Sequence, residues 1–281
     1  MDLREFRPSP EQVNEAATLL HYQPFVLDDD RHTGVAYSWL YSEDPTRSRY
    51  SEFLFDRRAL PEEVWRKAWD ANGRLAAMYD AFAEVIVDTC GQGSMLDIGC
   101  NTGYLPVKAS LAGVRNSAGM DHVDWSRAFH LLNQITGSRA QFLLGHYDPS
   151  VSSVLLASGA SLQQYDVVSS TAVLCHMPDP LHFLRAISRI ASKAVFLWSG
   201  FMETDELLIR YSGSNKFRTG EFPHAFDDGT SISLGLLFHS MSALGLHRHE
   251  EIRHRPEWLA EDWHKARIPQ YQQFRAFMFY R

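Results

Sequence analysis

Cysteine is scarce in this sequence of 281 residues, which contains three cysteines at widely separated positions: Cys90, Cys100 and Cys175. An odd number at such spacing favours neither a disulfide framework nor a cysteine-based zinc site. This usage is typical of the reducing cytoplasm, where we expect the protein to reside. The sequence also has no H-E-x-x-H or comparable spacing of metal ligands, so we expect no bound metal.

Long apolar runs are absent as well. The first residues are charged and lead into Pro8-Ser9-Pro10, which is unlike the apolar core of a secretory signal. No apolar run approaches the roughly 20 residues that a membrane-spanning helix needs. We therefore expect neither secretion nor a membrane partner.

Basic residues are fewer than acidic ones: the sequence has 27 Lys and Arg and 34 Asp and Glu, which gives a formal net charge of -7. Binding to nucleic acid relies on clustered Lys and Arg, so a nucleic-acid partner is not expected. A small-molecule substrate fits this balance better. The length fits one large α/β domain with an appended segment, and no pattern indicates an oligomeric state.

Residues 1–90 are predicted to form an amino-terminal helical extension. Ser9 and Pro10 are typical of a helix start and predict a helix over 9–20. Pro61 opens a second, long helix, because apolar residues recur at helical spacing as far as Cys90. The aromatic residues between the two helices fit either a lid over the substrate or simple core packing.

Residues 91–281 alternate short apolar runs with helical stretches. This alternation predicts an α/β, Rossmann-like, doubly wound and mostly parallel sheet with helices on both faces. The segment 200–233 is longer than an ordinary connection, so we expect it to act as a substrate lid. Strands are expected at 95–98, 117–120, 141–144, 165–170, 194–198, 247–253 and 274–280, with helices at 104–113, 124–135, 180–190 and 234–244.

The most informative stretch covers residues 96–104, where the first strand turns into the first helix. Gly99 and Gly103 let the backbone pass close to a ligand. The dinucleotide pattern G-x-G-x-x-G is not met, since Asn101 replaces its second glycine. Asp97 would repel a pyrophosphate but suits an ammonium group. S-adenosylmethionine has an amino-acid tail and no phosphate, so it is the expected ligand.

Further polar residues follow the next strands. Asp121, at the end of the second strand, can accept hydrogen bonds from both ribose hydroxyls. After the third strand, Asp148 could accept from the adenine amino group, and His146 or Tyr147 could pack on the ring. The loop over residues 170–180, after the fourth strand, is expected beside the methyl group.

Together these residues resemble the class I S-adenosylmethionine-dependent methyltransferase family over roughly residues 92–200. The resemblance rests on Leu-Asp-Ile-Gly-Cys-Asn-Thr-Gly, on the ribose acid, and on Tyr-Asp-Val-Val…Val-Leu-Cys-His-Met-Pro-Asp-Pro. It implies a seven-stranded sheet with one antiparallel strand near its end, and S-adenosyl-L-methionine as cofactor. The cofactor-binding residues expected on this basis are Asp97, Gly99, Cys100, Asn101, Gly103, Tyr104, Asp121, His122, His146, Tyr147, Asp148, Thr171 and Ala172.

The stretch after the fourth strand is also similar to the bacterial tRNA wobble-uridine carboxymethyltransferase group. That group uses a carboxylated cofactor held by extra basic residues, and these have no match in this sequence. A tRNA-modifying methyl- or carboxymethyltransferase remains an alternative.

An amine or hydroxyl acceptor must lose a proton during methyl transfer, which calls for a base or a metal. His176 is the candidate catalytic base, because its loop flanks the expected methyl group. A structural histidine before Pro178 is the other interpretation. The expected function is O- or N-methylation of a small polar acceptor such as a sugar, lipid headgroup or secondary metabolite. A non-catalytic cofactor-binding protein and a dehydrogenase are the alternatives.

Overall fold

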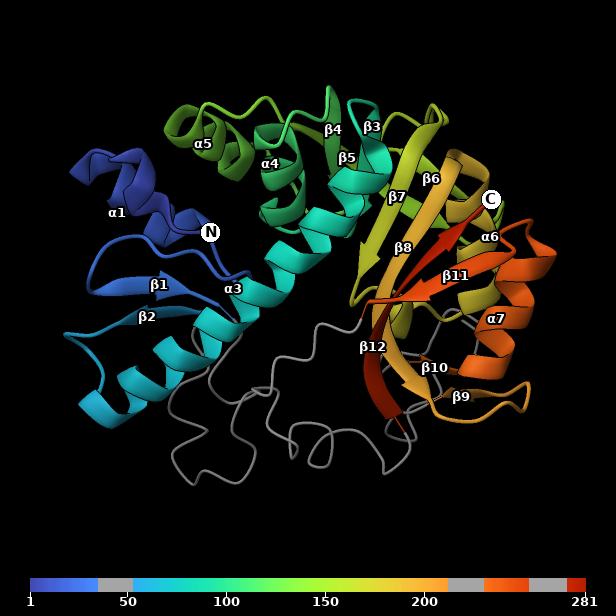
Figure 1. Ribbon diagram of the computed structural model, residues 1–281. Helices are drawn as coiled ribbons and strands as arrows, with labels where there is room; N and C mark the ends of the chain where they lie inside the picture. The colour runs from blue at the N-terminus through green and yellow to red at the C-terminus, as the bar shows by residue number, and fades with distance from the viewer. Residues whose placement is uncertain (35–52, 212–229, 253–271) are drawn as a thin grey trace.

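The computed structural model describes residues 1–34, 53–211, 230–252 and 272–281 (Figure 1). A large mixed sheet forms the middle layer of these residues, and helices pack on both of its faces. None of the helices in these ranges is long and apolar enough to cross a lipid bilayer.

The main sheet contains ten strands among the described residues, in the order β11-β12-β8-β7-β3-β4-β5-β6, with β10 and β9 added beside β8. β12 (Gln272–Tyr280) is antiparallel to β8 and to β11 (Arg248–Glu251). The seven strands from β11 to β5 are those expected, including one antiparallel strand near the end. The five parallel strands are β3 (Ser94–Ile98), β4 (Asn116–Asp121), β5 (Gln141–Asp148), β7 (Tyr165–Thr171) and β8 (Ala191–Met202).

Three strands extend the sheet beyond the expected seven. β6 (Ser153–Leu156) returns antiparallel along β5. β9 (Ile209–Tyr211) pairs with β10 (Thr230–Ser233), which itself runs parallel to the end of β8. Both strands come from the segment expected to be a lid, so parts of that segment belong to the sheet. Residues 212–229 of the same segment lie outside the described residues, and a lid stays a prediction.

Successive residues along the strands face two apolar cores, as the period of two in a strand requires. On β7, Val167 lies in one core and Val168 in the other. Helices contribute to both cores, as expected for parallel strands that are buried on both faces. The first core includes α3 (Glu62–Cys90), α4 (Tyr104–Leu111) and α5 (Ser126–Thr136), and the second includes α6 (Pro180–Ile190) and α7 (Leu234–Ala243).

Much of the amino-terminal extension packs into the first core. α1 (Pro10–Leu19) begins at a capping box, in which the Gln12 N–H donates to Ser9 Oγ at 3.3 Å and the Ser9 N–H donates to Gln12 Oε1 at 2.9 Å. The predicted helices over 9–20 and from Pro61 to Cys90 are confirmed. The extension also contains η1 (Leu3–Phe6) and a small sheet of β1 (Arg31–Thr33) and β2 (Leu54–Asp56), which the pattern did not predict.

Candidate active site

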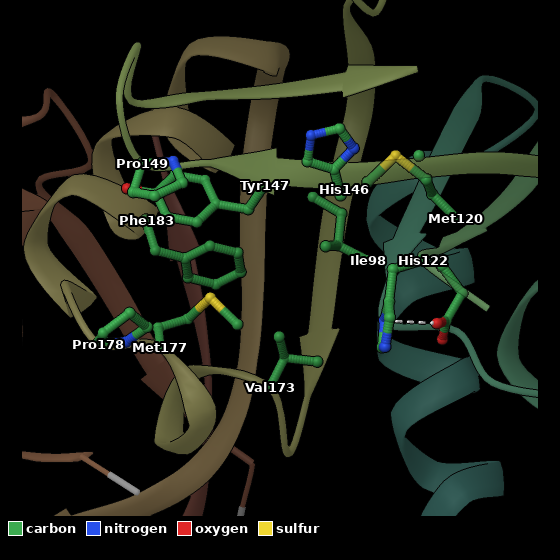
Figure 2. Close-up of a pocket in the computed structure, with 13 residues that line it drawn as sticks. Ile98, Met120, His122, His146, Tyr147, Pro149, Val173, Met177, Pro178 and Phe183 are labelled. Carbon is green, nitrogen blue, oxygen red and sulfur yellow. Dashed lines mark ion pairs between the residues drawn. The ribbon is translucent and has the colours of Figure 1, made fainter. Parts of the chain in front are cut away.

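A cavity of about 260 Å³ opens at the carboxyl ends of the parallel strands (Figure 2). Open α/β sheets bind ligands at this edge. Figure 2 shows Tyr147, Phe183 and Met177 on one side of the cavity, with Met120 and His122 opposite. The lining includes the expected residues Gly99, Asp121, His122, His146 and Tyr147, together with Ile98, Met120, Gly145, Pro149, Val173, Met177, Pro178 and Phe183.

The glycine loop, residues 99–103, joins β3 to α4 with left-handed backbone at Gly99 (φ 73°), Asn101 (φ 49°) and Gly103 (φ 97°). A Cβ atom on Gly99 would lie 2.2 Å from a methyl carbon of Val173, and one on Gly103 would lie 2.6 Å from the Phe129 ring. Both glycines are therefore required by backbone conformation and by close protein packing. The sequence predicted glycine at these two positions because the backbone must pass close to a ligand. The structure adds a second reason, which is close packing against Val173 and Phe129.

The carboxylate of Asp97 is fully buried beside this loop. Its Oδ1 accepts a hydrogen bond from Ser169 Oγ at 2.7 Å, whereas its Oδ2 has no hydrogen-bond partner among the described residues. Burial raises the pKa of Asp97 to about 7, and the nearby Asp121 adds to the rise. The protein thus holds an acid whose charge is not compensated. Asp97 is not among the residues that line the cavity.

Asp121 closes β4 and links two loops at the edge of the sheet. The Asn101 N–H donates to its Oδ2 at 3.0 Å, and the Val123 N–H donates to its Oδ1 at 3.0 Å. His122 Nδ1 lies 3.1 Å from the same Oδ1 (Figure 2). A carboxylate offers about four acceptor positions, so capacity remains for a ligand hydroxyl. Asp121 lines the cavity, where the predicted ribose contact would require it.

The β5–β6 hairpin brings two of its three expected residues to the cavity. His146 and Tyr147 line it, and the Tyr147 ring meets Phe183 edge-on at 5.4 Å. The carboxylate of Asp148 instead accepts hydrogen bonds from the N–H and the hydroxyl of Ser150, at 2.8 and 2.6 Å. β5 continues to Asp148 rather than ending near 144, so this acid sits at the hairpin turn and does not line the cavity.

Tyr104 does not face the cavity either. Its hydroxyl donates to Asp80 Oδ1 at 2.8 Å and accepts from the amino group of Met1 at 2.6 Å. Its ring packs between Phe25 and Tyr79, inside the first core. The structure therefore directs this side chain away from the position at which cofactor binding was predicted.

Cys100 is buried within the glycine loop, and burial raises the pKa of its thiol well above the ordinary value. It is therefore a neutral thiol at physiological pH and not a nucleophile. Its N–H and that of Gly99 both donate to the carbonyl oxygen of Met120, at 3.1 and 2.8 Å. These two bonds fix the start of the loop to β4.

The loop after β7 contains the remaining expected residues. Thr171 is buried at the end of the strand, and Ala172 has a left-handed backbone (φ 56°) with its N–H donating to the carbonyl oxygen of Trp198 at 2.7 Å. His176 lies on η3 (Leu174–His176) and is exposed. Desolvation lowers the pKa of His176, so its imidazole is neutral at pH 7 and able to accept a proton. None of the three lines the cavity.

Two groups of residues at the cavity and the glycine loop were not expected from the sequence. The apolar wall consists of Val173 and Met177, in the loop after β7, and Phe183, in α6; the sequence predicted the loop and the helix but not this wall. Gln23 contacts the glycine loop from the amino-terminal extension, and no local pattern marks it. Among the described residues, no group of three or more His, Cys, Asp or Glu side chains could hold a metal ion.

Comparison with known proteins places this site in a family. A family model described as a methyltransferase domain matches residues 55–214, which is more than half of the chain. The match begins within β2 and includes α3, so it extends upstream of the boundary expected near residue 90. No curated protein sequence matches the chain.

Solved structures with a similar fold include the following two. The N-terminal domain of EvdMO1 with SAH bound has a TM-score of 0.51 at 14% identity, covering 72% of this chain and 80% of that chain. A putative sarcosine dimethylglycine methyltransferase from Galdieria sulphuraria has a TM-score of 0.50 at 13% identity, covering 74% and 87%. Since the family model spans the glycine loop, the strands that carry the cavity and the loop after β7, this chain belongs to the class I S-adenosylmethionine-dependent methyltransferases.

Proposed function

We propose that this methyltransferase methylates an oxygen or nitrogen atom of a small polar acceptor. The main support for a cofactor site is the buried carboxylate of Asp97 beside the glycine loop, in which one oxygen is hydrogen-bonded and the other has no partner among the described residues. A buried charge is costly unless it is paired, and the ammonium group of an amino-acid tail would pair it.

The residues present fit S-adenosylmethionine in three places. Asp97 has a free carboxylate oxygen for the ammonium group, and Asp121 has acceptor capacity for the ribose hydroxyls. The apolar wall formed by Met177, Val173 and Phe183 suits the adenine ring. The cavity is slightly smaller than the roughly 300–1,000 Å³ of most small-molecule sites, so it suits the nucleoside part alone. When bound, the cofactor supplies an electrophilic methyl group on a positively charged sulfur.

The small polar acceptor is supported by charge and by likeness. A net charge of -7 disfavours a large polyanion such as RNA. A similar fold occurs in a protein whose name states sarcosine and dimethylglycine as its substrates, both small amines. The segment 200–233, as a lid, would enclose such an acceptor.

Transfer of label from the tritiated methyl group of S-adenosylmethionine tests this proposal. With a cell extract divided into small molecules, RNA and protein, we expect the label in the small-molecule fraction, in an amount that rises with enzyme concentration. Label in the RNA fraction alone would contradict the proposal and favour the tRNA-modifying alternative.

Gly99 and Gly137 provide a matched pair of variants. Both have a left-handed backbone, at φ 73° and 74°, but a Cβ atom on Gly137 meets nothing within 4 Å. We expect Gly99→Ala to weaken binding of S-adenosylhomocysteine by about tenfold or more, because it displaces Val173 from the cavity wall. Gly137→Ala pays a similar backbone cost of about 1–2 kcal/mol and should leave affinity unchanged. Calorimetry measures both, and equal affinities would argue against the site.

Cofactor binding should depend on the ionisation of Asp97. Its pKa of about 7 in the folded protein lies above the unfolded value, so it stabilises the fold at low pH and loses this contribution as pH rises through 7. The ionised form pairs with an ammonium group, so affinity for S-adenosylhomocysteine should fall about tenfold from pH 8 to pH 6. Calorimetry in two buffers of different ionisation enthalpy should detect proton release at pH 6.

Asp97→Asn is the control for this linkage. The variant should be more stable than the unaltered protein at pH 8 by about 1–3 kcal/mol, because it removes an uncompensated buried charge. It should bind S-adenosylhomocysteine weakly and without proton release. Unchanged, pH-dependent binding by Asp97→Asn would show that another group is responsible.

His176 is proposed as the base that accepts the proton of the acceptor. We expect His176→Ala to lower kcat by about a hundredfold, because a positioned base commonly contributes that much. Affinity for S-adenosylhomocysteine should stay within about twofold, since His176 does not line the cavity. Steady-state kinetics with the identified acceptor measures kcat, and an unchanged kcat would leave His176 with a structural role.

A further inference from the structure

Gln23 connects the amino-terminal extension to the glycine loop. Gln23 is 2% exposed, and its side chain bonds two loop residues and the first residue of α4. The amide Nε2 donates to the carbonyl oxygen of Cys100 at 3.1 Å, and Oε1 accepts from the Tyr104 N–H at 3.0 Å and from the Thr102 hydroxyl at 3.1 Å. The amide therefore uses both lone pairs of its oxygen and one of its donors on the glycine loop and the start of α4.

Two features of the glycine loop make these hydrogen bonds important for its conformation. Gly103 is the N-cap residue of α4 and has no side chain to accept from the first N–H groups of the helix. Gln23 supplies that acceptor from 81 residues away in the sequence. Asn101 adopts a left-handed backbone that non-glycine residues rarely adopt, so outside contacts must hold the loop in place.

The backbone around Gln23 is itself anchored. Its carbonyl oxygen accepts from the Thr33 hydroxyl at 2.7 Å, and its N–H donates to the carbonyl oxygen of His21 at 2.7 Å. The ring of His21 packs edge-on against Trp125 at 4.7 Å, in the loop that follows Asp121. The segment 20–34 thus touches both loops that would contact the cofactor, one after β3 and one after β4.

We propose that Gln23 is a positioning residue that makes docking of the segment 20–34 and binding of the cofactor mutually dependent. This inference rests on the proposed cofactor site at the glycine loop. A ligand that prefers the ordered loop must also favour the docked segment, and by linkage the docked segment must favour the ligand. Loss of the amide should therefore weaken cofactor binding more than it slows methyl transfer from the saturated enzyme.

Gln23→Leu removes all three bonds at similar side-chain volume, and Gln12→Leu is the matched control. Gln12 also caps a helix of the same extension but bonds Ser9 and not the glycine loop. We expect Gln23→Leu to raise the Kd for S-adenosylhomocysteine and the KM for S-adenosylmethionine by about tenfold or more, with kcat within about threefold. Gln12→Leu should change the Kd by less than about twofold, even if it lowers stability.

Hydrogen exchange tests the same coupling by a second measurement, made on the unaltered protein and on Gln23→Leu. Saturating S-adenosylhomocysteine should slow amide exchange in residues 20–34, and this slowing should disappear in Gln23→Leu. A folded Gln23→Leu with unchanged Kd, or no slowing in the unaltered protein, would overturn the inference while the cofactor site stands. Absence of S-adenosylhomocysteine binding by the unaltered protein would overturn both.

Discussion

Burial of the Asp97 carboxylate at the carboxyl edge of the sheet is the constraint on which the site depends. The side chain is fully buried, one oxygen is bonded to Ser169, and the other has no partner among the described residues. In the protein alone, burial disfavours this charge and raises the pKa of Asp97. In the proposed site, a cationic ligand group would pair with this carboxylate and gain binding energy from it, whereas a pyrophosphate would add a second negative charge. On this proposal, electrostatics would separate this site from the dinucleotide sites that share the strand-loop-helix geometry.

The glycine loop next to Asp97 is held by contacts from three directions. β4 fixes its start through the carbonyl oxygen of Met120 and its middle through Asp121. Val173 packs against Gly99 from the loop after β7. Gln23 bonds it from the amino-terminal extension. A site built on backbone groups needs such support, because small displacements of its donors change affinity and rate strongly.

The parts of the fold that could be predicted are those with a regular pattern of apolar residues over a short stretch of sequence. Strands β3, β4, β7 and β8 and their helices have apolar periodicity that is visible within a few residues of sequence. Asp148 was assigned to the adenine because the third strand was expected to end near 144, and pairing with β6 extends that strand to the turn. Tyr104 follows the loop, but tertiary packing against Met1 and Asp80 turns its hydroxyl into the core. Gln23 is separated from its partners by 77 to 81 residues, so no local pattern could reveal it.

The central claim is that Asp97 recognises the ammonium group of the cofactor's tail. Comparing S-adenosylhomocysteine with 5′-methylthioadenosine, which has the nucleoside but no amino-acid tail, isolates that contribution by calorimetry. In the unaltered protein at pH 8, S-adenosylhomocysteine should bind about tenfold or more tightly than methylthioadenosine, and Asp97→Asn should remove most of the difference. An equal preference for S-adenosylhomocysteine in both proteins would contradict the account.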